Sequence, residues 1–329
     1  MRIVVTGATG FIGSNLARYL IDRGHAVVAT GRAANPVETR RLAELEQAGV
    51  RVAAGSLLDQ GFAAGLVSDC DTVIHLAAAQ HEGNVPDSYF HDINVGATGL
   101  LLDAAVAAGV RRFVYGSTIG VYGSATQGEL DENSPTRPEN AYARTKLAAE
   151  SLVSTYASRI QTCIARISET YGPGDFRLLK LFRAIDRGRF IMLGSGLNVR
   201  QVVYVDDLNM GLLLAAEHPA AVGQTFVLCG TEVMTTTQMV ASIAAALGHT
   251  RNVPRVPVWP FRAAAAVLET TLRPLGIQPP LTQRRLDFFT KSFLFSTAKS
   301  RQSLGFAPQI RFDTGAAKAA EWYRKAGYL

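Results

Sequence analysis

Tyr142 and Lys146 stand four residues apart in the segment Tyr142-Ala143-Arg144-Thr145-Lys146, which leads into a run rich in alanine and leucine. In a helix, this spacing places the phenol and the ammonium group on one face. A free phenol has a pKa of about 10, and a nearby cation lowers that pKa because it stabilises the phenolate. The pair therefore predicts a proton donor and acceptor that works near neutral pH.

A hydroxyl group is predicted to lie close to this pair. The expected strand Arg112–Tyr115 leads to Gly116-Ser117-Thr118, where Thr118 is placed to hold the oxygen of a substrate. Asn94 is a candidate for orienting Lys146 through a water molecule. Each feature also has an ordinary interpretation, because Tyr and Lys at this spacing are common on surface helices and Thr118 serves equally to close a turn.

Three glycines, Gly7, Gly10 and Gly13, occur in the turn Thr6-Gly7-Ala8-Thr9-Gly10-Phe11-Ile12-Gly13 near the N-terminus. The turn follows a predicted strand and opens a predicted helix, where backbone N–H groups and the helix dipole can hold a pyrophosphate. Glycine is required there for the tight turn and for close approach of the phosphates. We therefore predict a dinucleotide site here rather than an ordinary connection between a strand and a helix.

The end of the second predicted strand reads Thr30-Gly31-Arg32 and has no carboxylate. An acidic residue at this place bonds the adenosine ribose of NAD, whereas an arginine accommodates the 2′-phosphate of NADP. Arg32 therefore favours NADP(H), with NAD(H) as the alternative if Arg32 is only a solvated loop residue.

Short β-branched runs alternate with longer alanine- and leucine-rich segments over the first 165 residues, which is typical of βαβ units around a parallel sheet. We expect helices over Gly96–Ala108 and Tyr142–Ala157. We expect strands over Ile3–Val5, Ala26–Thr30, Val50–Ala53, Thr72–Leu76, Arg112–Tyr115 and Gln161–Ala165. The fold class is α/β, a Rossmann-type doubly wound parallel sheet with a smaller, discontinuous C-terminal substrate lobe.

The alternation of strand-like and helix-like segments ends after Ile167. Prolines cluster from Val253 onward, as expected of an irregular lobe. The strand Thr225–Leu228 is expected to return to the sheet. The dinucleotide-binding domain is therefore predicted to cover residues 1–170 plus about 203–229, and the substrate lobe about 171–202 plus 230–329. The apolar segment Val256 to Leu268 is expected to pack within this lobe rather than lie on a membrane.

Composition excludes several other classes. The chain has 33 Lys and Arg against 27 Asp and Glu, but the basic residues are scattered, so we expect no nucleic-acid partner. Cys70, Cys163 and Cys229 lack metal-ligand spacing, and His81-Glu82 lacks the second histidine of a zinc-protease helix, so no metal is expected. The three cysteines are odd in number and far apart in the sequence, which favours a reducing, cytoplasmic setting over a disulfide framework. No apolar run reaches the roughly 20 residues of a membrane span.

These motifs together resemble the extended short-chain dehydrogenase/reductase family, of the NAD-dependent epimerase/dehydratase type, with features of the 3β-hydroxysteroid dehydrogenase-like branch. The resemblance extends over nearly the whole chain. The matching segments are Thr6–Gly13, His75-Leu76-Ala77-Ala78, Asn94, Ser117-Thr118 before Val121-Tyr122-Gly123, Tyr142 with Lys146, Tyr171-Gly172-Pro173-Gly174-Asp175, Arg200 with Tyr204-Val205-Asp206-Asp207, and Lys299 with Leu304-Gly305-Phe306.

The resemblance assigns roles to individual residues. Tyr142 becomes the acid/base, Lys146 lowers its pKa and binds the nicotinamide ribose, and Thr118 positions the reacting oxygen, whereas His75 is structural. Substrate contacts are expected from Thr118, Glu169 and Arg200. The resemblance also implies a homodimer that forms through the two predicted helices Gly96–Ala108 and Tyr142–Ala157. Cofactor contacts are expected from Gly7, Thr9, Gly10, Phe11, Ile12, Gly13, Arg32, Ser56, Leu57, Leu76, Ala77, Ala78, Tyr142, Lys146 and Ile167.

The type of reaction stays divided between two candidates. Sugar 4,6-dehydratases of the family carry Asp-Glu where this chain has Ile119-Gly120, which disfavours dehydration. Nucleotide-sugar enzymes commonly have Asn at the position of Glu169, although Arg200 matches their phosphate-binding arginine. The first candidate is a nucleotide-sugar epimerase. The alternative is a net NADP(H)-dependent alcohol dehydrogenase or ketone reductase, whose apolar ligand would suit an aromatic lobe with Trp259, Phe261, Phe288 and Phe289.

Two other classes are weighed against these enzymes. A cofactor-binding regulatory protein would not need Tyr142 and Lys146. A hydrolase is suggested by Gly116-Ser117-Thr118-Ile119-Gly120, but the central residue of that near-match to a nucleophile elbow is a threonine.

Overall fold

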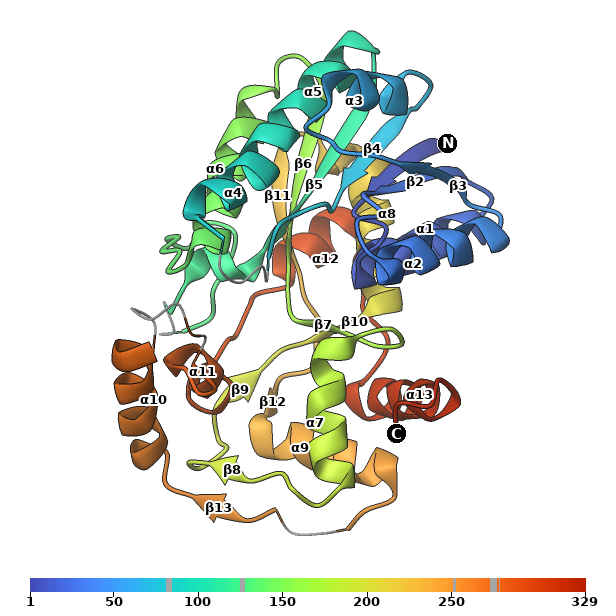
Figure 1. The fold of residues 1–329 in the computed structure, drawn as a ribbon. Coiled ribbons are helices and arrows are strands. Elements are labelled where there is room, and N and C mark those ends of the chain that lie inside the picture. Colours follow the sequence, from blue (N-terminus) through green and yellow to red (C-terminus); the bar gives the residue numbers. More distant parts are fainter. Residues whose placement is uncertain (81–84, 125–127, 251–252, 273–276, 278) are drawn as a thin grey trace.

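A seven-stranded parallel sheet forms the centre of the larger part of the protein. The computed structural model describes residues 1–80, 85–124, 128–250, 253–272, 277 and 279–329, so the His81-Glu82 pair lies outside the described residues. The strands run in the order β11-β6-β5-β4-β1-β2-β3 (Figure 1). Their bounds are β1 (Arg2–Thr6), β2 (Ala26–Gly31), β3 (Arg51–Ala54), β4 (Thr72–His75), β5 (Arg112–Thr118), β6 (Gln161–Ile167) and β11 (Gln224–Leu228).

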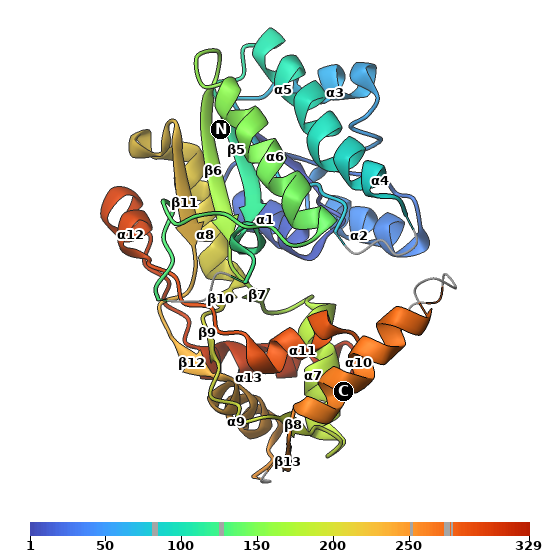
Figure 2. The same cartoon turned by 90° about the vertical axis from the view of Figure 1, so that its left-hand side faces the viewer.

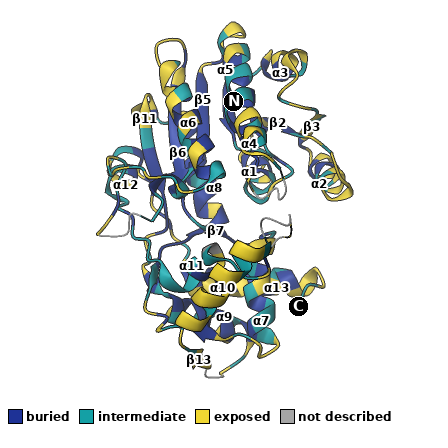
Figure 3. Cartoon of the chain, turned by 60° about the vertical axis from the view of Figure 1, so that its left-hand side comes forward, coloured by how far each residue is buried: buried dark blue, intermediate teal, exposed yellow. Residues whose placement is uncertain are grey.

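Helices cover both faces of this sheet, as the predicted fold class requires. One face packs against α1 (Phe11–Ile21), α2 (Pro36–Gln47), α8 (Val205–Glu217) and α12 (Ala298–Leu304). The other face packs against α3 (Gln60–Val67), α5 (Ala97–Ala107) and α6 (Ala141–Thr155). Colouring by burial shows the central strands mostly dark blue and the outward faces of these helices yellow, whereas the edge strand β3 has no buried residue (Figure 3). The alternating pattern of the sequence thus reflects a sheet that is buried on both faces.

The chain reverses its winding between β1 and β4, which are neighbours in the sheet. In doubly wound sheets, ligands bind in the crevice that such a reversal leaves at the carboxyl ends of the strands. The glycine turn follows β1, and Leu76-Ala77-Ala78 follows β4, so both lie at this crevice. The topology therefore places the two matching motifs beside each other.

A second group of elements lies below the carboxyl edge of the sheet (Figure 2). Its helices are α7 (Phe176–Asp186), α9 (Thr236–Leu247), α10 (Trp259–Leu272), α11 (Gln283–Thr290) and α13 (Phe312–Lys325). Its short strands are β7 (Thr170–Tyr171), β8 (Met192–Leu193), β9 (Val199–Arg200), β10 (Val203–Tyr204), β12 (Met234–Thr235) and β13 (Arg255–Val256). The elements have their own apolar core, centred on Phe182, Ile243 and Tyr323. The exact division of the chain into two domains stays a prediction.

Several predicted elements differ from the observed ones. Strands β5 and β6 continue to Thr118 and Ile167, because both remain buried and paired over seven residues. The predicted helix Gly96–Ala108 is entered through α4 (Asp87–His91) and the π-helical turn Asp92–Gly96. The expectation that the segment Val256 to Leu268 packs inside the lobe is wrong for most of α10. Its buried residue is Ala265, while Trp259 is 70% exposed and Val267 61%.

Among the described residues, no helix is both long enough and apolar enough to cross a membrane. Within the same residues, no group of three or more His, Cys, Asp or Glu side chains is arranged to hold a metal ion.

Candidate active site

Glycine is required at the first turn because backbone segments meet there without room for a side chain. Gly7 has φ +72°, and a Cβ added to it would lie 2.7 Å from the backbone nitrogen of Ala77. A Cβ on Gly13 would overlap the carbonyl oxygen of Gly7. Helix α1 begins after Gly10, and no side chain accepts a hydrogen bond from its first turn. The first N–H groups of the helix can therefore bind a ligand. These residues fit the pyrophosphate of a dinucleotide.

The opposite wall is fixed by a buried relay through His75. The Oγ1 of Thr6 accepts hydrogen bonds from the backbone N–H groups of Leu76 and Ala77, both at 3.1 Å, and donates to His75 Nδ1 at 2.7 Å. His75 Nε2 then donates to Thr98 Oγ1 at 2.9 Å. Burial, with a smaller effect of Lys146, lowers the pKa of His75 to about 3. His75 is therefore neutral and holds the loop after β4, which agrees with the structural role predicted for it.

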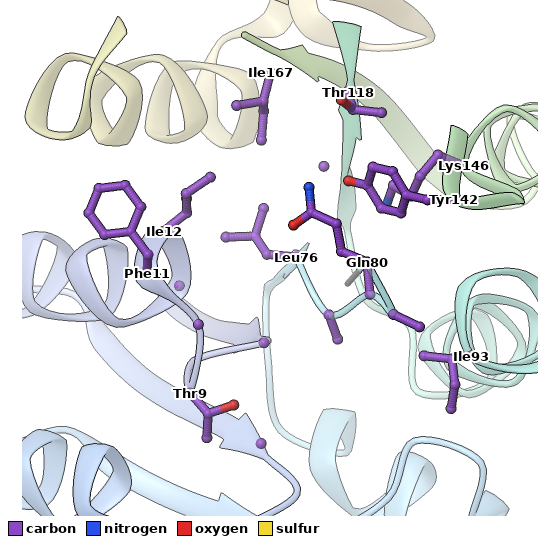
Figure 4. Close-up of a pocket in the computed structure, with 18 of the residues that line it drawn as sticks. Thr9, Phe11, Ile12, Leu76, Gln80, Ile93, Thr118, Tyr142, Lys146 and Ile167 are labelled. Atoms are coloured by element: carbon purple, nitrogen blue, oxygen red, sulfur yellow. The ribbon is translucent and has the colours of Figure 1, made fainter. Parts of the chain in front are cut away.

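Tyr142 and Lys146 lie in the first turns of α6, which Asn140 caps by accepting a hydrogen bond from Ala143 N at 2.9 Å. Both residues line the cavity, and the hydroxyl of Tyr142 points across β5 towards the amide of Gln80, with Thr118 further along the strand (Figure 4). Lys146 is 1% exposed, and its Nζ lies 4.0 Å from the centroid of the Tyr115 ring. Burial lowers the pKa of Lys146 to about 7, although Glu150 acts in the opposite direction.

Thr118 ends β5 and has two roles in the local structure. Its Oγ1 accepts a hydrogen bond from Gly120 N at 3.1 Å and so caps the 3-10 turn Ile119–Tyr122. The residue also lines the cavity on the side of Tyr142. The turn-closing interpretation and the functional one are therefore compatible, because the hydroxyl hydrogen can still be donated to a ligand.

Asn94 is completely buried in the π-helical turn and does not line the cavity. Its Oδ1 accepts from Ala79 N at 2.8 Å, and its Nδ2 donates to Ala79 O at 3.0 Å and to Thr145 Oγ1 at 2.9 Å. Asn94 thus joins the loop after β4 to the residue before Lys146. The proposed water bridge to Lys146 itself stays a prediction.

A cavity of about 560 Å³ connects the glycine turn with Tyr142, which is a typical size for a ligand pocket. All the residues predicted to contact the cofactor line it, namely Gly7, Thr9, Gly10, Phe11, Ile12, Gly13, Arg32, Ser56, Leu57, Leu76, Ala77, Ala78, Tyr142, Lys146 and Ile167. The fold therefore brings together residues from the ends of β1, β2, β3, β4 and β6 and from α6, although lining does not by itself establish contact with a cofactor.

At the end of the cavity near β2, Arg32 is exposed and donates from Nη1 to the hydroxyl of Tyr89 at 3.1 Å. Glu38, in the first turn of α2, also lines the cavity, and its Oε2 accepts from Ala34 N at 2.9 Å. The end of β2 itself has no carboxylate, as the sequence analysis noted, but the carboxylate of Glu38 reaches the same end of the cavity from α2. The sequence indicates that Glu38 lies in the first turn of a helix that begins at Pro36, but its position at the cavity depends on the path of the chain after β2.

Glu169 and Arg200, predicted separately, form an ion pair with 2.7 Å between Oε2 and Nη1. Arg200 is 3% exposed and does not line the cavity, whereas Glu169 does. The guanidinium of Arg200 also lies 4.2 Å from the centroid of the Phe288 ring and donates to Phe288 O at 2.7 Å. Burial opposes ionisation of Glu169, but Arg200 and Arg177 outweigh it and lower the pKa of this carboxyl.

Sequence reasoning missed other residues that line the cavity. Gln80 extends its amide between Leu76 and Tyr142 in Figure 4, and Arg177 follows the loop that ends at Asp175. Neither belongs to a motif with fixed spacing, so no sequence signal could have found them. The aromatic residues expected of an apolar lobe are distributed differently: Trp259 is exposed, whereas Phe261, Phe288 and Phe289 pack against the apolar clusters of the lobe.

Residues 3–229 match the model of the NAD dependent epimerase/dehydratase family. The chain belongs to this family of NAD-dependent enzymes.

Two relatives and one solved structure that this chain resembles are named for different activities or ligands. The dTDP-glucose 4,6-dehydratase of Streptomyces antibioticus is 29% identical over 342 residues, which cover 98% of this chain and 92% of that protein. The 2-alkyl-3-oxoalkanoate reductase of Stenotrophomonas maltophilia is 29% identical over 96% of this chain and 97% of its own length. The solved structure of MoeE5 in complex with UDP-glucuronic acid and NAD has a TM-score of 0.77 and 26% identity over 99% of this chain and 100% of that chain.

Proposed function

We propose that this enzyme interconverts a secondary alcohol and a ketone by hydride transfer, with Tyr142 as the acid/base. The observation that carries the proposal is the convergence of Tyr142, Lys146 and Thr118 on one cavity with the glycine turn. A nicotinamide dinucleotide bound to that turn would accept the hydride from the alcohol carbon or return it to the ketone carbon.

The residues of the chain handle the proton in this reaction. During oxidation, the O–H bond of the alcohol breaks as its C–H bond does, and the phenolate of Tyr142 takes the proton. During reduction, the phenol returns it to the ketone oxygen. The hydroxyl of Thr118 holds that oxygen in place, and a protonated Lys146 stabilises the phenolate from the same helix face. Because the pKa of Lys146 is lowered to about 7, its charge depends on pH within the working range.

Nucleotide-sugar epimerisation is the first candidate for the reaction as a whole. It is supported by the family model, by a relative named for dTDP-glucose, and by the similarity to MoeE5, whose structure contains UDP-glucuronic acid. In an epimerase, the ketone formed at the cavity would be reduced again from its other face without leaving, so the dinucleotide shows no net change.

Net reduction of a ketone, or oxidation of an alcohol, is the second candidate, and the Glu169–Arg200 ion pair favours it. The predicted phosphate-binding arginine is already neutralised by a carboxylate that lines the cavity. A diphosphate near Glu169 would meet a like charge, whereas an uncharged substrate would not. The similarity to a 2-alkyl-3-oxoalkanoate reductase supports the same candidate.

For the cofactor, Arg32 supports a preference for NADP(H), because an exposed guanidinium at the end of β2 can pair with a 2′-phosphate. Glu38 and the NAD in MoeE5 support NAD(H). We retain NADP(H) as the proposal and NAD(H) as the alternative.

We also propose that the enzyme is a cytoplasmic homodimer associated through α5 and α6. The expected mass by light scattering is twice the 35.3 kDa of one chain, and a monomer at working concentration would contradict the proposal.

One experiment separates the two candidate functions. Purified enzyme is incubated with NAD(H) or NADP(H) and a panel of nucleotide sugars, ketones and sterols, and both absorbance at the reduced nicotinamide band and product identity by chromatography and mass spectrometry are followed. Isomerised sugar without net absorbance change supports the epimerase. Stoichiometric conversion of the cofactor supports the reductase. If neither outcome is observed with any substrate of the panel, hydride transfer is contradicted and a regulatory, cofactor-binding role is favoured.

A further inference from the structure

A buried, charged network lies directly behind the reacting groups. The carboxylate of Glu150 accepts a hydrogen bond from Ser117 Oγ at 2.5 Å, and it accepts from Nε and Nη2 of Arg166 at 3.1 and 2.8 Å. Arg166 Nη1 continues the network to the hydroxyl of Tyr122 at 2.9 Å. The side chains of Glu150 and Arg166 are only 6% and 9% exposed, so this is an ion pair of the protein interior.

The network joins three elements that carry reacting or cavity-lining groups. Glu150 lies on α6 one turn after Lys146, and so shares the face that carries Tyr142 and Lys146. Its partners Ser117 and Arg166 each directly precede a cavity-lining residue at the end of a strand, Thr118 on β5 and Ile167 on β6. A buried pair of charges needs good geometry and further hydrogen bonds to offset its desolvation, and here both are present.

The surroundings of the Lys146 ammonium group make the charge of Glu150 important. On α6, Tyr142 and Glu150 lie one turn before and one turn after Lys146 on the same helix face. The ring of Tyr115 on β5 lies 4.0 Å from the ammonium group, and the charge of Lys146 also acts on the neutral His75 on β4. Arg166, the cation on β6, is held by the carboxylate of Glu150. Among these groups, Glu150 supplies the negative charge that favours the protonated form of Lys146.

We propose that Glu150 is a positioning residue of the active site. It fixes the ends of β5 and β6 against α6 and favours the protonated form of Lys146, while Arg166 neutralises part of its negative charge. The inference rests on the proposed role of Lys146 at the dinucleotide. It assigns Glu150 no contact with the substrate or the cofactor.

The test measures dinucleotide affinity against pH, with NADH or NADPH alone as the probe and nicotinamide fluorescence as the signal. Affinity falls as pH rises through the value at which Lys146 loses its proton. In E150Q, which keeps the shape of the side chain but not its charge, the midpoint of this fall should move down by about one pH unit, the low end for loss of a neighbouring opposite charge. In R166Q, where the charge of Glu150 is no longer balanced, the midpoint should move up.

Two controls separate charge from structure. E150D keeps the negative charge, and Y122F breaks the hydrogen bond to Arg166 without changing any charge, so both should keep a midpoint close to that of the wild type. If E150Q does not fold, R166Q still tests the proposal. A purely structural role of Glu150 gives no reason for the pH midpoint of dinucleotide affinity to move up in R166Q. A midpoint in folded E150Q equal to that of the wild type, or an unmoved midpoint in R166Q, overturns the proposal. Because the titration needs no substrate, it stays readable even if every substrate of the panel fails and the proposed function is contradicted.

Discussion

The carboxylate of Glu169 lies 2.7 Å from the buried guanidinium of Arg200, although the two residues are 31 positions apart in the sequence. Arg200 is also stacked on Phe288 and bonded to its carbonyl oxygen, so one arginine ties the β6–β7 connection to the end of α11. The cavity therefore meets the carboxylate of this pair, while the cation stands behind it.

Replacing Glu169 should change which substrates the cavity accepts. In E169N the charge of Arg200 is no longer neutralised, and one negative charge is removed from the cavity wall. The KM for a nucleotide sugar should fall by about tenfold, the effect of ~1–2 kcal/mol from one unit charge a few ångströms away, while the KM for an uncharged ketone changes little. E232Q, which breaks the ion pair with Arg311 elsewhere, is the matched control. Equal changes for both kinds of substrate would argue against a charge effect.

Tyr142→Phe should lose most turnover and keep cofactor affinity. General acid/base catalysis contributes ~10²–10⁴-fold, and the substitution removes only the hydroxyl group. Steady-state kinetics and a dinucleotide binding titration measure the two effects. Tyr156→Phe removes a phenol at the other end of α6, where it bonds Asp103, and should leave kcat unchanged. Unchanged kcat in Y142F would disprove the acid/base assignment.

Arg32 and Glu38 should act in opposite directions on cofactor choice. R32A removes a cation that can pair with a 2′-phosphate, so NADP(H) should lose more affinity than NAD(H). E38Q removes a negative charge from the same end of the cavity and should strengthen NADP(H) relative to NAD(H). Parallel binding titrations with both cofactors give the ratio. Equal effects of R32A on the two would refute the selectivity proposed for it.

The burial of His75 predicts a pH-dependent stability. Its folded pKa of about 3 lies below the ordinary histidine pKa of 6.5, so between these values the unfolded chain binds a proton that the folded chain does not. Stability is thus lost as pH falls from 6.5 towards 3, with a slope that this group steepens by up to about 1.4 kcal/mol per pH unit. Urea unfolding at pH 7, 6 and 5 measures the slope, which should be shallower in H75Q. Equal slopes in both proteins would show that His75 does not contribute.

Gly7→Ala should damage both folding and cofactor binding more than the backbone angle alone explains. Gly7 and Gly49 have similar φ values, +72° and +85°, but an added Cβ meets the backbone of Ala77 at Gly7 and nothing within 4 Å at Gly49. G49A therefore measures the cost of the left-handed conformation by itself, about 1 kcal/mol. Unfolding free energies of the two variants give the difference. A G7A protein as stable as G49A, with unchanged affinity, would contradict the required close approach.

The sequence was sufficient to predict the features that depend on local spacing. The glycine turn, the Tyr142–Lys146 pair and the strands of the sheet each occupy a short segment whose residue types determine its conformation. Glu38 and Gln80 could not be found in this way, because their places at the cavity depend on the paths of the chain after β2 and β4. Ala33, with φ +53°, lies on the first of these paths. The Glu169–Arg200 pair could not be found either, because it depends on the pairing of β7 with β10 and of β9 with β12, which local spacing does not reveal.

The π-helical turn Asp92–Gly96 fixes the number of residues between α4 and α5. Such a turn is an α-helix with one residue inserted, and it shifts all following side chains by about 100° around the axis. Asn94 lies within this turn, where its amide bonds both Ala79 and Thr145. Deleting a single residue here should remove the π-helical turn and rotate the amide of Asn94 away from both partners, so the loop after β4 and the start of α6 would lose the side chain that joins them.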